Sequence, residues 1–403
     1  MTDKLSFWKN KPVKIRPQSP VTTIKSGEEL VKMVSDEITN SKIQLDYQLI
    51  NMCDTELQPI IEFINKNYMN NNSDHMLSYN TDMIKFFLGD PKNSLVLAFY
   101  PRTSNNSNKK IVGVVCGSKH KLCIRGKDSD SFECMDINFL CVAKQLRKIH
   151  VSSYIINIIT RECVERFGVI CAGYTTGVTL KIPHFSKKWY YHRLINIDKT
   201  IQTQLFSEEF DSEVIRKVYN TFNYQTVFKR QHALEYHGRA NGTAPNCFIQ
   251  KLASITQALQ NYCHTNYDVY FEKTLTEIQK IFDNPNFHVF LVMRDNQITD
   301  FVSLFNIDTM CLDNGETCRN GYLYYYYFSN DSLDHKQNVL EMIAEYCYQH
   351  NIFDLLTVCD PFGVSSHEYK TIKFLRGTGS LNYYMYNMKM HKILNENNGL
   401  VTI

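Results

Sequence analysis

Residues 136–153 read DINFLCVAKQLRKIHVSS, and this stretch decides the fold. It starts with an apolar run typical of a strand, passes through a basic turn, and leads into the helical spacing of residues 154–164. A strand that ends just before a helix N-terminus leaves backbone amides free, and such amides form an anion site. The pattern predicts a place for the pyrophosphate of a nucleotide-like cofactor. The basic turn contains Lys144, Arg147, Lys148 and His150.

Length and composition are those of an ordinary globular chain. With 403 residues the chain is long for one hydrophobic core and suits two domains. A net charge of +3 predicts no strong attraction to nucleic acid or to a membrane surface. Residues 1–14 lack the apolar core of a signal peptide, and no run is apolar enough to span a membrane. We therefore expect a cytoplasmic monomer that neither binds nucleic acid nor inserts stably into a membrane.

The 13 cysteines are an odd number and are scattered along the chain. The sequence contains no pair of CxxC motifs and no Cys/His set at zinc spacing, so we expect reduced, mostly buried thiols and no metal site. Cys141 is the most tempting nucleophile, but it falls inside an apolar run with no adjacent base. We therefore expect no covalent cysteine intermediate.

Hydrophobic periodicity predicts an order of elements that occurs twice. The first half is expected to begin with helices at 27–40, 56–68 (with Asp54 as N-cap) and 81–88. These helices are followed by a strand at 94–100, its hairpin partner at 110–119, a strand at 133–142, a helix to about 167 and a strand at 168–174. The second half repeats this order at 287–294, 297–307, 321–328, 332–350 and 352–359. The offset of about 190 residues indicates an internal duplication, joined near residues 201–212.

The two copies differ in the turn that precedes the helix. Residues 329–331 are acidic where the first copy is basic, so only the first copy is expected to hold cofactor phosphates. We therefore expect residues 1–205 to form an acyl-CoA-binding domain and residues 206–403 to be free for another substrate, which the family resemblance given below implies to be a peptide. The predicted fold class is α/β (α+β): tandem duplicated GNAT-like acyl-CoA N-acyltransferase domains around a saddle-shaped mixed sheet, splayed between the fourth and fifth strands.

Several stretches share motifs with one family. They read FWKNKPV at 7–13, DINFLCVAKQLR at 136–147, YTTGV at 174–178, YYHR at 190–193, TDFVS at 299–303 and KFLRGTGSLNYYMYN at 373–387, and the chain ends in GLVTI. In this order, over nearly the whole chain, they resemble the glycylpeptide N-tetradecanoyltransferase (protein N-myristoyltransferase) family. The resemblance implies transfer of myristate from myristoyl-CoA, a co-substrate rather than a resident cofactor, to the α-amine of an N-terminal glycine.

The resemblance also implies the catalytic groups. The backbone amides of Phe139 and Leu140 would stabilise the tetrahedral oxyanion, and one such donor contributes about 3 kcal/mol. The α-carboxylate of Ile403 would be the general base, because burial raises the pKa of a carboxylate and lowers that of an ammonium until the two meet. Thr175 would hold the amine and Asn138 a water molecule, although each alone is typical of a structural polar residue at a strand end.

Binding residues follow from the same resemblance. Phe7 and Trp8 would contact the adenine end of CoA, although two aromatics near a terminus also suit a hydrophobic plug. Gly177 would leave no side chain beside the substrate glycine. His192 would line the peptide channel, although a histidine among aromatics is more often structural. The expected myristoyl-CoA contacts are Ser6, Phe7, Trp8, Leu140, Cys141, Val142, Arg147, Lys148, His150, Val151 and Ser152. The expected peptide contacts are Tyr68, Gly177, Tyr190, His192, Ser303, Asp360 and Gly379.

Some positions depart from the family pattern. The acidic loop before the peptide channel is here rich in amides, at 69–74, with Asp74 as its single acid, which predicts a weaker preference for basic peptides. His150 replaces an arginine of the CoA turn, so CoA affinity is expected to fall as pH rises past about 6.5. The long basic amino-terminal extension of the family is absent, which leaves ribosome association open.

Two other functions fit the same residues. One is an acyltransferase of this fold with a different acyl donor, and the other is a catalytically silent acyl-CoA or peptide binder. Acylation of a lysine beside the terminal glycine also stays open. The intact motif at 136–147 and the apolar chain end favour the active transferase.

Overall fold

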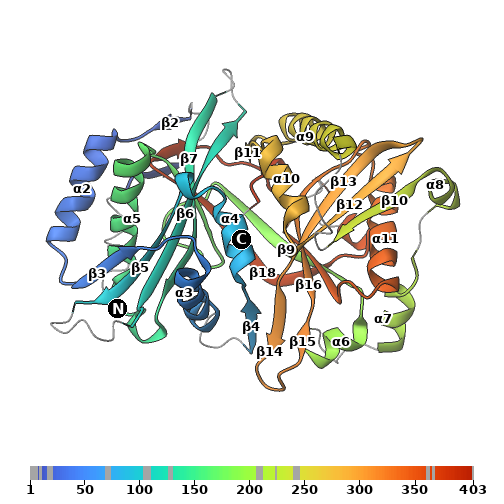
Figure 1. The fold of residues 1–403 in the computed structure, drawn as a ribbon, viewed down its shortest axis with the longest axis horizontal. Coiled ribbons are helices and arrows are strands. Elements are labelled where there is room, and N and C mark those ends of the chain that lie inside the picture. Colours follow the sequence, from blue (N-terminus) through green and yellow to red (C-terminus); the bar gives the residue numbers. More distant parts are fainter. Residues whose placement is uncertain are drawn as a thin grey trace.

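The structure is a computed structural model that describes residues 8, 11–15, 21–68, 74–102, 110–125, 130–205, 212–222, 225–238, 246–359, 364 and 368–401. Most of its strands form one mixed sheet of 13 strands that runs through the whole molecule, and two sheets of three strands complete it (Figure 1). The main sheet has the order β10-β12-β13-β16-β17-β9-β18-β8-β7-β6-β5-β3, with β11 paired to β6.

The first half contains the predicted hairpin and splayed strands. β5 (Ser94–Pro101), β6 (Gly113–Ile124) and β7 (Asp130–Val142) pair antiparallel. β7 then pairs parallel with β8 (Ala172–Thr176), but only over residues 135–137. Beyond that point the two strands separate, and α5 (Val151–Phe167) connects them. This separation leaves the strand end and the helix start accessible from between the strands.

Side chains of β5 alternate between two hydrophobic layers. Leu95, Leu97 and Phe99 pack with α5, while Val96 and Ala98 pack with the helices on the other face. Because neighbouring strand residues point to opposite faces, both faces of this sheet are covered and the strand reads as a continuous apolar run. Those other helices are α3 (Asp54–Asn67) and α4 (Thr81–Leu88).

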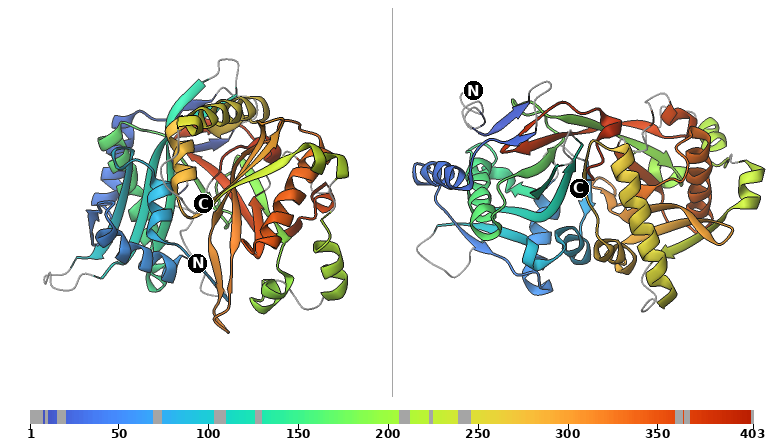
Figure 2. Two further views of the ribbon diagram at one scale, coloured as in Figure 1. Left: turned by 45° about the vertical axis from the view of Figure 1, so that its right-hand side comes forward. Right: turned by 90° about the horizontal axis from the view of Figure 1, so that it is seen from above.

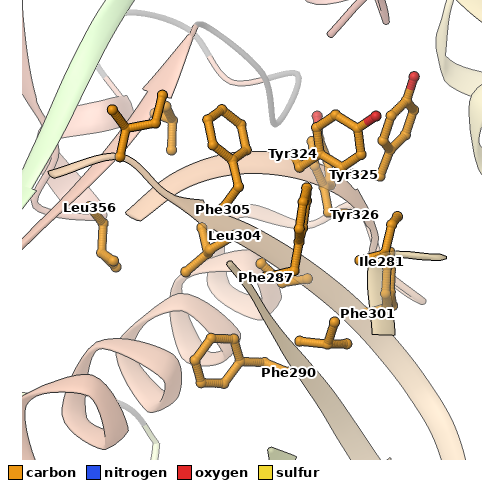
Figure 3. Close-up of a cluster of buried hydrophobic side chains, with 14 of the residues drawn as sticks. Ile281, Phe287, Phe290, Phe301, Leu304, Phe305, Tyr324, Tyr325, Tyr326 and Leu356 are labelled. Carbon is orange, nitrogen blue, oxygen red and sulfur yellow. The ribbon is translucent and has the colours of Figure 1, made fainter. Parts of the chain in front are cut away.

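The second half repeats this arrangement, as the sequence predicts. It consists of β12 (Phe287–Arg294), β13 (Gln297–Asn306), β16 (Asn320–Tyr327), α11 (Leu333–Gln349) and β17 (Leu355–Cys359). β16 pairs parallel with β17 only over residues 320–322, so these strands separate as β7 and β8 do. Its core is rich in aromatic rings, and Figure 3 shows Phe287, Phe290, Phe301 and Phe305 among them.

The two halves exchange their last strands. β9 (Ser186–Leu194) follows β8 in the chain but pairs with β17, and β18 (Leu375–Tyr386) follows β17 but pairs with β8. β9 and β18 also pair with each other, so they join the blue-to-green half to the yellow-to-red half (Figures 1 and 2). The sequence periodicity gives no sign of this exchange.

The remaining elements are shorter or peripheral. None of the described helices has the length and apolar content of a membrane span. The remaining strands are β1 (Val13–Ile15), β2 (Thr22–Thr23), β3 (Leu45–Leu49), β4 (His75–Ser78), β10 (Ala233–Gly238), β11 (Val269–Phe271), β14 (Asp308–Cys311), β15 (Thr317–Cys318) and β19 (Met388–Met390). The remaining helices are α2 (Gly27–Thr39), α6 (Ile197–Gln202), α7 (Ser212–Tyr219), α8 (Thr226–Gln231), α9 (Asn246–Asn266), α10 (Leu275–Asp283) and α12 (Glu368–Thr371).

The predicted capping of α3 is wrong in detail. Asp54 is the first residue of the helix rather than its N-cap, and Cys53 takes the cap position without a side-chain hydrogen bond. The Asp54 carboxylate instead pairs with Lys85 at 2.7 Å. The Glu56 carboxylate accepts a hydrogen bond from the Asn51 amide at 2.9 Å. Glu56, rather than Asp54, therefore ties the first turn of the helix to the preceding segment.

Candidate functional site

A cavity of about 1490 Å³ lies where the two halves meet. Its wall combines the separated ends of β7 and β8 with strands of the second half and with residues 398–401. The structure brings together at this cavity eleven of the residues predicted from the sequence. They are Trp8, Tyr68, Asn138, Phe139, Leu140, Ser152, Thr175, Gly177, Tyr190, His192 and Gly379.

The strand break at Phe139 is a β-bulge. Phe139 and Leu140 together lie opposite the single residue Val115 in the β6–β7 register. Phe139 has a left-handed φ of 54°, which is unusual for a bulky residue and costs about 1–3 kcal/mol. Its ring is 1% exposed and packs against Tyr68 and Tyr79 at centroid distances of 5.8 and 5.3 Å. Burial of the ring offsets the backbone strain and fixes where the two bulge amides point.

The basic turn ends at an uncapped helix start. His150 has a left-handed φ of 61°, occupies the N-cap of α5 and makes no side-chain cap bond. The Lys148 and His150 side chains are exposed, whereas the Arg147 guanidinium donates to the carbonyls of Val142 and Asn67. Arg147 therefore fixes the turn, and the exposed side chains of Lys148 and His150 lie close in sequence to the first-turn amides of α5. Cys141, Val142 and Val151 are buried next to this turn.

Equivalent positions in the second half are filled by its own side chains. Ser303 lies opposite the bulge of β16, donates to the Tyr325 carbonyl at 2.7 Å and accepts from the Tyr325 amide at 3.0 Å. The Asp300 carboxylate accepts from the Ser329 amide at 2.9 Å and contacts His335 Nε2 at 2.7 Å. Both Asp300 and Ser303 are fully buried. Thus Ser303, predicted as a peptide contact, is placed in the interior and not on the described wall of the cavity.

Asn138 connects the bulge to a buried carboxyl group. Its side-chain amide donates to Asp136 at 2.7 Å, and it faces the cavity from β7. Burial raises the pKa of Asp136, and its second oxygen has no hydrogen-bond partner among the described residues. Asn138 is thereby held in one orientation at the edge of the bulge. Thr175 lies near the end of β8, opposite Tyr383.

Tyr190 and His192 face the cavity from β9. His192 Nδ1 lies 2.9 Å from the Thr357 hydroxyl, which itself donates to Asn320 Oδ1 at 2.8 Å. The Thr357 hydrogen is therefore used, so His192 Nδ1 is the donor and Nε2 is left as an acceptor. Desolvation lowers the pKa of His192 to about 4, so the ring is neutral at pH 7.

Glycines form the wall opposite these two side chains. Residues 377–379 bulge out between the paired residues Arg376 and Ser380 of β18. A Cβ on Gly377 would lie 2.6 Å from His192 Nε2, and one on Gly379 would lie 3.1 Å from the Tyr190 ring. At Gly177 a Cβ would meet only the Ser380 carbonyl, at 3.5 Å. The protein itself therefore leaves room for a side chain at Gly177.

The end of the chain runs along the cavity wall. The Gly399 amide donates to the Val269 carbonyl at 2.8 Å, and the Leu400 amide donates to Asn398 Oδ1 at 3.0 Å. Leu400 is 3% exposed, and both it and Val401 line the cavity. The buried end agrees with the expectation from the apolar terminus as far as Val401. Ile403, like Ser6, Phe7 and Asp360, lies outside the described residues.

Two features of the site were missed in the sequence. Trp8 stacks on Tyr174 at 6.0 Å, and Tyr174 stacks on Tyr384 at 5.3 Å, so the three rings form a column in which Trp8 and Tyr174 line the cavity. Lys188 also lines the cavity. The alternation of a strand would have revealed Lys188, since it lies two residues before Tyr190 and shares its face. Burial raises the pKa of Cys141 to about 12, which agrees with the rejection of Cys141 as nucleophile.

Comparisons with known proteins agree on one family. The family profile described as "Myristoyl-CoA:protein N-myristoyltransferase, N-terminal domain" matches residues 24–186, and the corresponding C-terminal domain matches residues 219–401. The glycylpeptide N-tetradecanoyltransferase of Candida glabrata is 25% identical, over 96% of this chain and 87% of that protein. That of Schizosaccharomyces pombe is also 25% identical, over 84% of this chain and 73% of that protein.

Solved structures give the same fold. A crystal structure of Saccharomyces cerevisiae N-myristoyltransferase with bound myristoyl-CoA has a TM-score of 0.78 at 18% identity, covering 98% of this chain and 99% of that one. A second, with bound myristoyl-CoA and inhibitors, has a TM-score of 0.80 at 19% identity, covering 100% and 97%. The expected mixed α/β fold is thereby confirmed.

Proposed function

The chain belongs to the myristoyl-CoA:protein N-myristoyltransferase family, and we propose that it transfers myristate from myristoyl-CoA to the α-amine of an N-terminal glycine. The observation that carries the proposal is the left-handed bulge at Phe139, set directly before an uncapped helix start. Such a bulge supplies oxyanion donors and such a helix start supplies a phosphate site. The second half fills both positions with its own groups, so we assign acyl-CoA to residues 1–205 and much of the peptide site to 206–403.

The acyl-CoA is proposed to lie between the separated strands. Its phosphates would bind the amides of Val151 and Ser152 and the side chains of Lys148 and His150, while Arg147 holds the turn. The acyl chain would occupy the apolar part of the cavity beside α5 and β8, and Trp8 would contact the adenine end together with Ser6 and Phe7. That apolar part is lined by Met135, Ile137, Ile156, Ile159, Cys163, Val164, Val169, Ile170, Cys171 and Ala172.

The chemical step is an attack of the free amine on the thioester carbon. The Ile403 carboxylate takes one proton from the glycine ammonium, while Thr175 and Asn138 orient the amine and a water molecule. As the C–N bond forms, the amides of Phe139 and Leu140 stabilise the oxyanion. The C–S bond then breaks, and the second amine proton goes to the departing CoA thiolate. No protein nucleophile is required, because the substrate amine is the nucleophile.

The peptide is proposed to run along the cavity wall that β9 and the glycine bulge of β18 form together. Tyr190 and His192 would line its path, and Gly377 and Gly379 let β18 pass close to these two side chains. A side chain at Gly177 would not clash with the protein itself, so we propose that its absence makes space for the bound substrate. The N-terminal residue of the substrate would lie against Gly177, where only a glycine would fit. Tyr68, Gly379 and Asp360 complete the proposed contacts. The interior position of Ser303 suits a role in shaping β16.

The setting is proposed to be the cytoplasm, with the protein acting as a monomer. All described cysteines are free thiols, which suits a reducing compartment.

The proposal is tested by CoA release from myristoyl-CoA with Gly- and Ala-initiated peptides in parallel. The Gly peptide is expected to release stoichiometric thiol and the Ala peptide at least a hundredfold less. Binding of myristoyl-CoA without thiol release would identify a silent binder. A faster reaction with a shorter or longer acyl-CoA would identify a transferase of this fold with a different donor.

A further inference from the structure

A carboxyl group is buried directly behind the wall of the large cavity. Asp136 is 7% exposed and does not itself line this cavity, whereas Asn138, two residues further along β7, does. Because residues two apart on a strand share a face, both side chains lie on the same side of the sheet. None of the described residues of the cavity wall is an aspartate or a glutamate, and Asp136 contacts the wall through the Asn138 amide.

The bond between these two side chains decides which atom Asn138 presents to the cavity. The Asn138 amide nitrogen Nδ2 donates to Asp136 Oδ2 at 2.7 Å. A carboxylate has acceptors and no donor, so the Asn138 amide cannot turn over without losing this bond. The Asn138 carbonyl oxygen makes no hydrogen bond to a described residue, and it is therefore the atom left to face the cavity.

Two basic side chains behind Asp136 counteract the effect of its burial. Asp136 borders a second cavity of about 450 Å³ together with His120, Lys273 and Glu277. His120 Nδ1 and Lys273 Nζ lie 3.7 and 3.1 Å from the Glu277 carboxylate, which holds both in place. Burial raises the pKa of Asp136, whereas His120, the Asn138 amide and Lys273 act in the opposite direction. They favour the carboxylate, which is the form that accepts and does not donate.

We propose that Asp136 is a positioning residue that turns the Asn138 carbonyl oxygen toward the amino group of the bound peptide. The inference rests on the proposed function, in which this amine enters the cavity beside Asn138. An ammonium or amine donates its N–H groups, so an acceptor oxygen suits it and an amide NH₂ group would repel it. The carboxylate behind the amide strengthens the attraction. Asp136 touches neither substrate, so it affects recognition of the amine and not acyl-CoA binding.

Three variants test this role. Asp136→Asn removes the charge and adds a donor, Asp136→Glu keeps the carboxylate, and Glu133→Gln is the matched control, the same chemical change at an exposed residue of β7. The measured quantity is the Kd of a Gly-initiated peptide and of the same peptide with an acetyl group in place of its N-terminal glycine. Isothermal titration calorimetry with a non-hydrolysable thioether analogue of myristoyl-CoA present gives both values without turnover.

The wild-type protein and Glu133→Gln are expected to bind the peptide with the free amine at least tenfold more tightly than the acetyl peptide. In Asp136→Asn the two Kd values should lie within threefold of each other, because either end of the Asn138 amide can then face the cavity. Asp136→Glu should restore most of the difference. The Kd of the acyl-CoA analogue should stay within threefold in all variants. The same ratio of the two peptide Kd values in Asp136→Asn and the wild-type protein would overturn the inference.

A measurement on the wild-type protein covers the case in which Asp136→Asn does not fold. One Asn138 side-chain amide proton is expected to be shifted downfield in the NMR spectrum by its bond to the carboxylate, with the signal assigned by its loss in Asn138→Asp. Two protons at the shifts of a solvent-exposed asparagine would overturn the inference. A wild-type protein that discriminates between the peptides but releases no thiol would refute the proposed transferase and leave this role of Asp136 standing.

Discussion

Single residues of the site are held by packing rather than by local preference. Phe139 adopts a left-handed backbone that a glycine would adopt more easily, yet its ring is wedged against Tyr68 and Tyr79. The penalty of about 1–3 kcal/mol is comparable to the gain from burying a phenylalanine. A glycine would relieve the strain but would let the bulge relax. The site therefore uses a strained residue because its side chain fixes the backbone.

His192 gives a prediction on pH and stability. Its folded pKa of about 4 lies below the ordinary value, so the unfolded chain binds more protons between pH 4 and 6.5. Stability from the neutral ring is therefore present at pH 7 and is lost as pH falls through this window. Between pH 7 and pH 4.5 the unfolding free energy of the His192→Asn variant is therefore expected to fall by about 2–3 kcal/mol less than that of the wild-type protein. Denaturant titrations of both proteins at the two pH values measure this difference.

The control for this measurement is Ser254→Ala, a change at an exposed residue of α9 that alters no titratable group. The difference in unfolding free energy between pH 7 and 4.5 is expected to equal that of the wild-type protein. If His192→Asn also parallels the wild-type curve, the ring is not buried in its neutral form.

Among the elements, the two bulges show how a duplicated scaffold becomes asymmetric. Both β7 and β16 carry two residues opposite one, at corresponding places. In β16 the Ser303 hydroxyl accepts a hydrogen bond from the bulge amide of Tyr325, and the Asp300 carboxylate accepts one from the Ser329 amide in the turn that follows. In β7 the residue opposite the bulge is Val115, which offers no hydrogen-bonding group. An apolar residue in place of a serine thus leaves one of two similar bulges available to a ligand.

The basic turn gives a prediction at this scale. Lys148→Ala with His150→Ala is expected to weaken myristoyl-CoA binding about tenfold at low salt, because the exposed Lys148 ammonium and the exposed His150 ring beside the phosphates are lost. The difference should shrink as added salt screens these charges. Isothermal titration calorimetry at 20 and 500 mM salt measures both effects. Lys32→Ala with Lys42→Ala, two exposed lysines near α2, is the control and should leave the affinity unchanged. Equal affinity in the turn variant would remove the phosphate assignment.

The C-terminal segment gives another prediction at the scale of elements. Leu400 and Val401 line the cavity, so residues added after Ile403 must displace the proposed base or leave it uncharged as an amide. We expect such an extension to lower kcat at least a hundredfold while the Kd for myristoyl-CoA stays within threefold. Stopped-flow thiol release and equilibrium binding measure the two quantities. Removing the extension by a self-cleaving intein that restores Ile403 should recover turnover, and a fully active extended protein would exclude the base role.

Much of each element could be predicted, but little of their pairing across the halves. Hydrophobic periodicity located β12, β13 and α11 to within a few residues, because each buries a regular face. The exchange of β9 and β18 left no local signal, since a strand reads the same whichever neighbour it pairs with. The role expected for the Phe139 amide came from resemblance, whereas the bulge itself was not predicted, because its left-handed φ depends on packing against Tyr68 and Tyr79. Strand alternation could have placed Lys188 on the face of Tyr190, but its contact at Leu400 has no local signal, because Leu400 is more than 200 residues away in the chain.

At the scale of the molecule, the exchanged strands make the halves interdependent. β9 belongs to the first half by sequence, but it pairs with β17 along one edge and with β18 along the other, and both of these strands belong to the second half. A fragment of residues 1–205 would therefore expose β9 and leave β8 without its partner β18. We expect neither 1–205 nor 206–403 to fold alone and the two to form a stable complex when coexpressed. Circular dichroism and urea unfolding of each fragment and of the pair measure this.

The intact chain offers the matching test. Differential scanning calorimetry is expected to show one unfolding transition, and saturating myristoyl-CoA should shift this single transition to a higher temperature. Two separate transitions, with only one moved by ligand, would show instead that the halves are independent domains and that the exchange contributes little to cohesion.

One wall of the cavity is made by residues 398–401, and this placement has a consequence for synthesis. A ribosome holds the most recently added residues in its exit tunnel, out of reach of the folded part. The pocket therefore stays open on one side until residues 398–401 have left the ribosome. A copy that stops before residue 398 lacks that wall of the cavity.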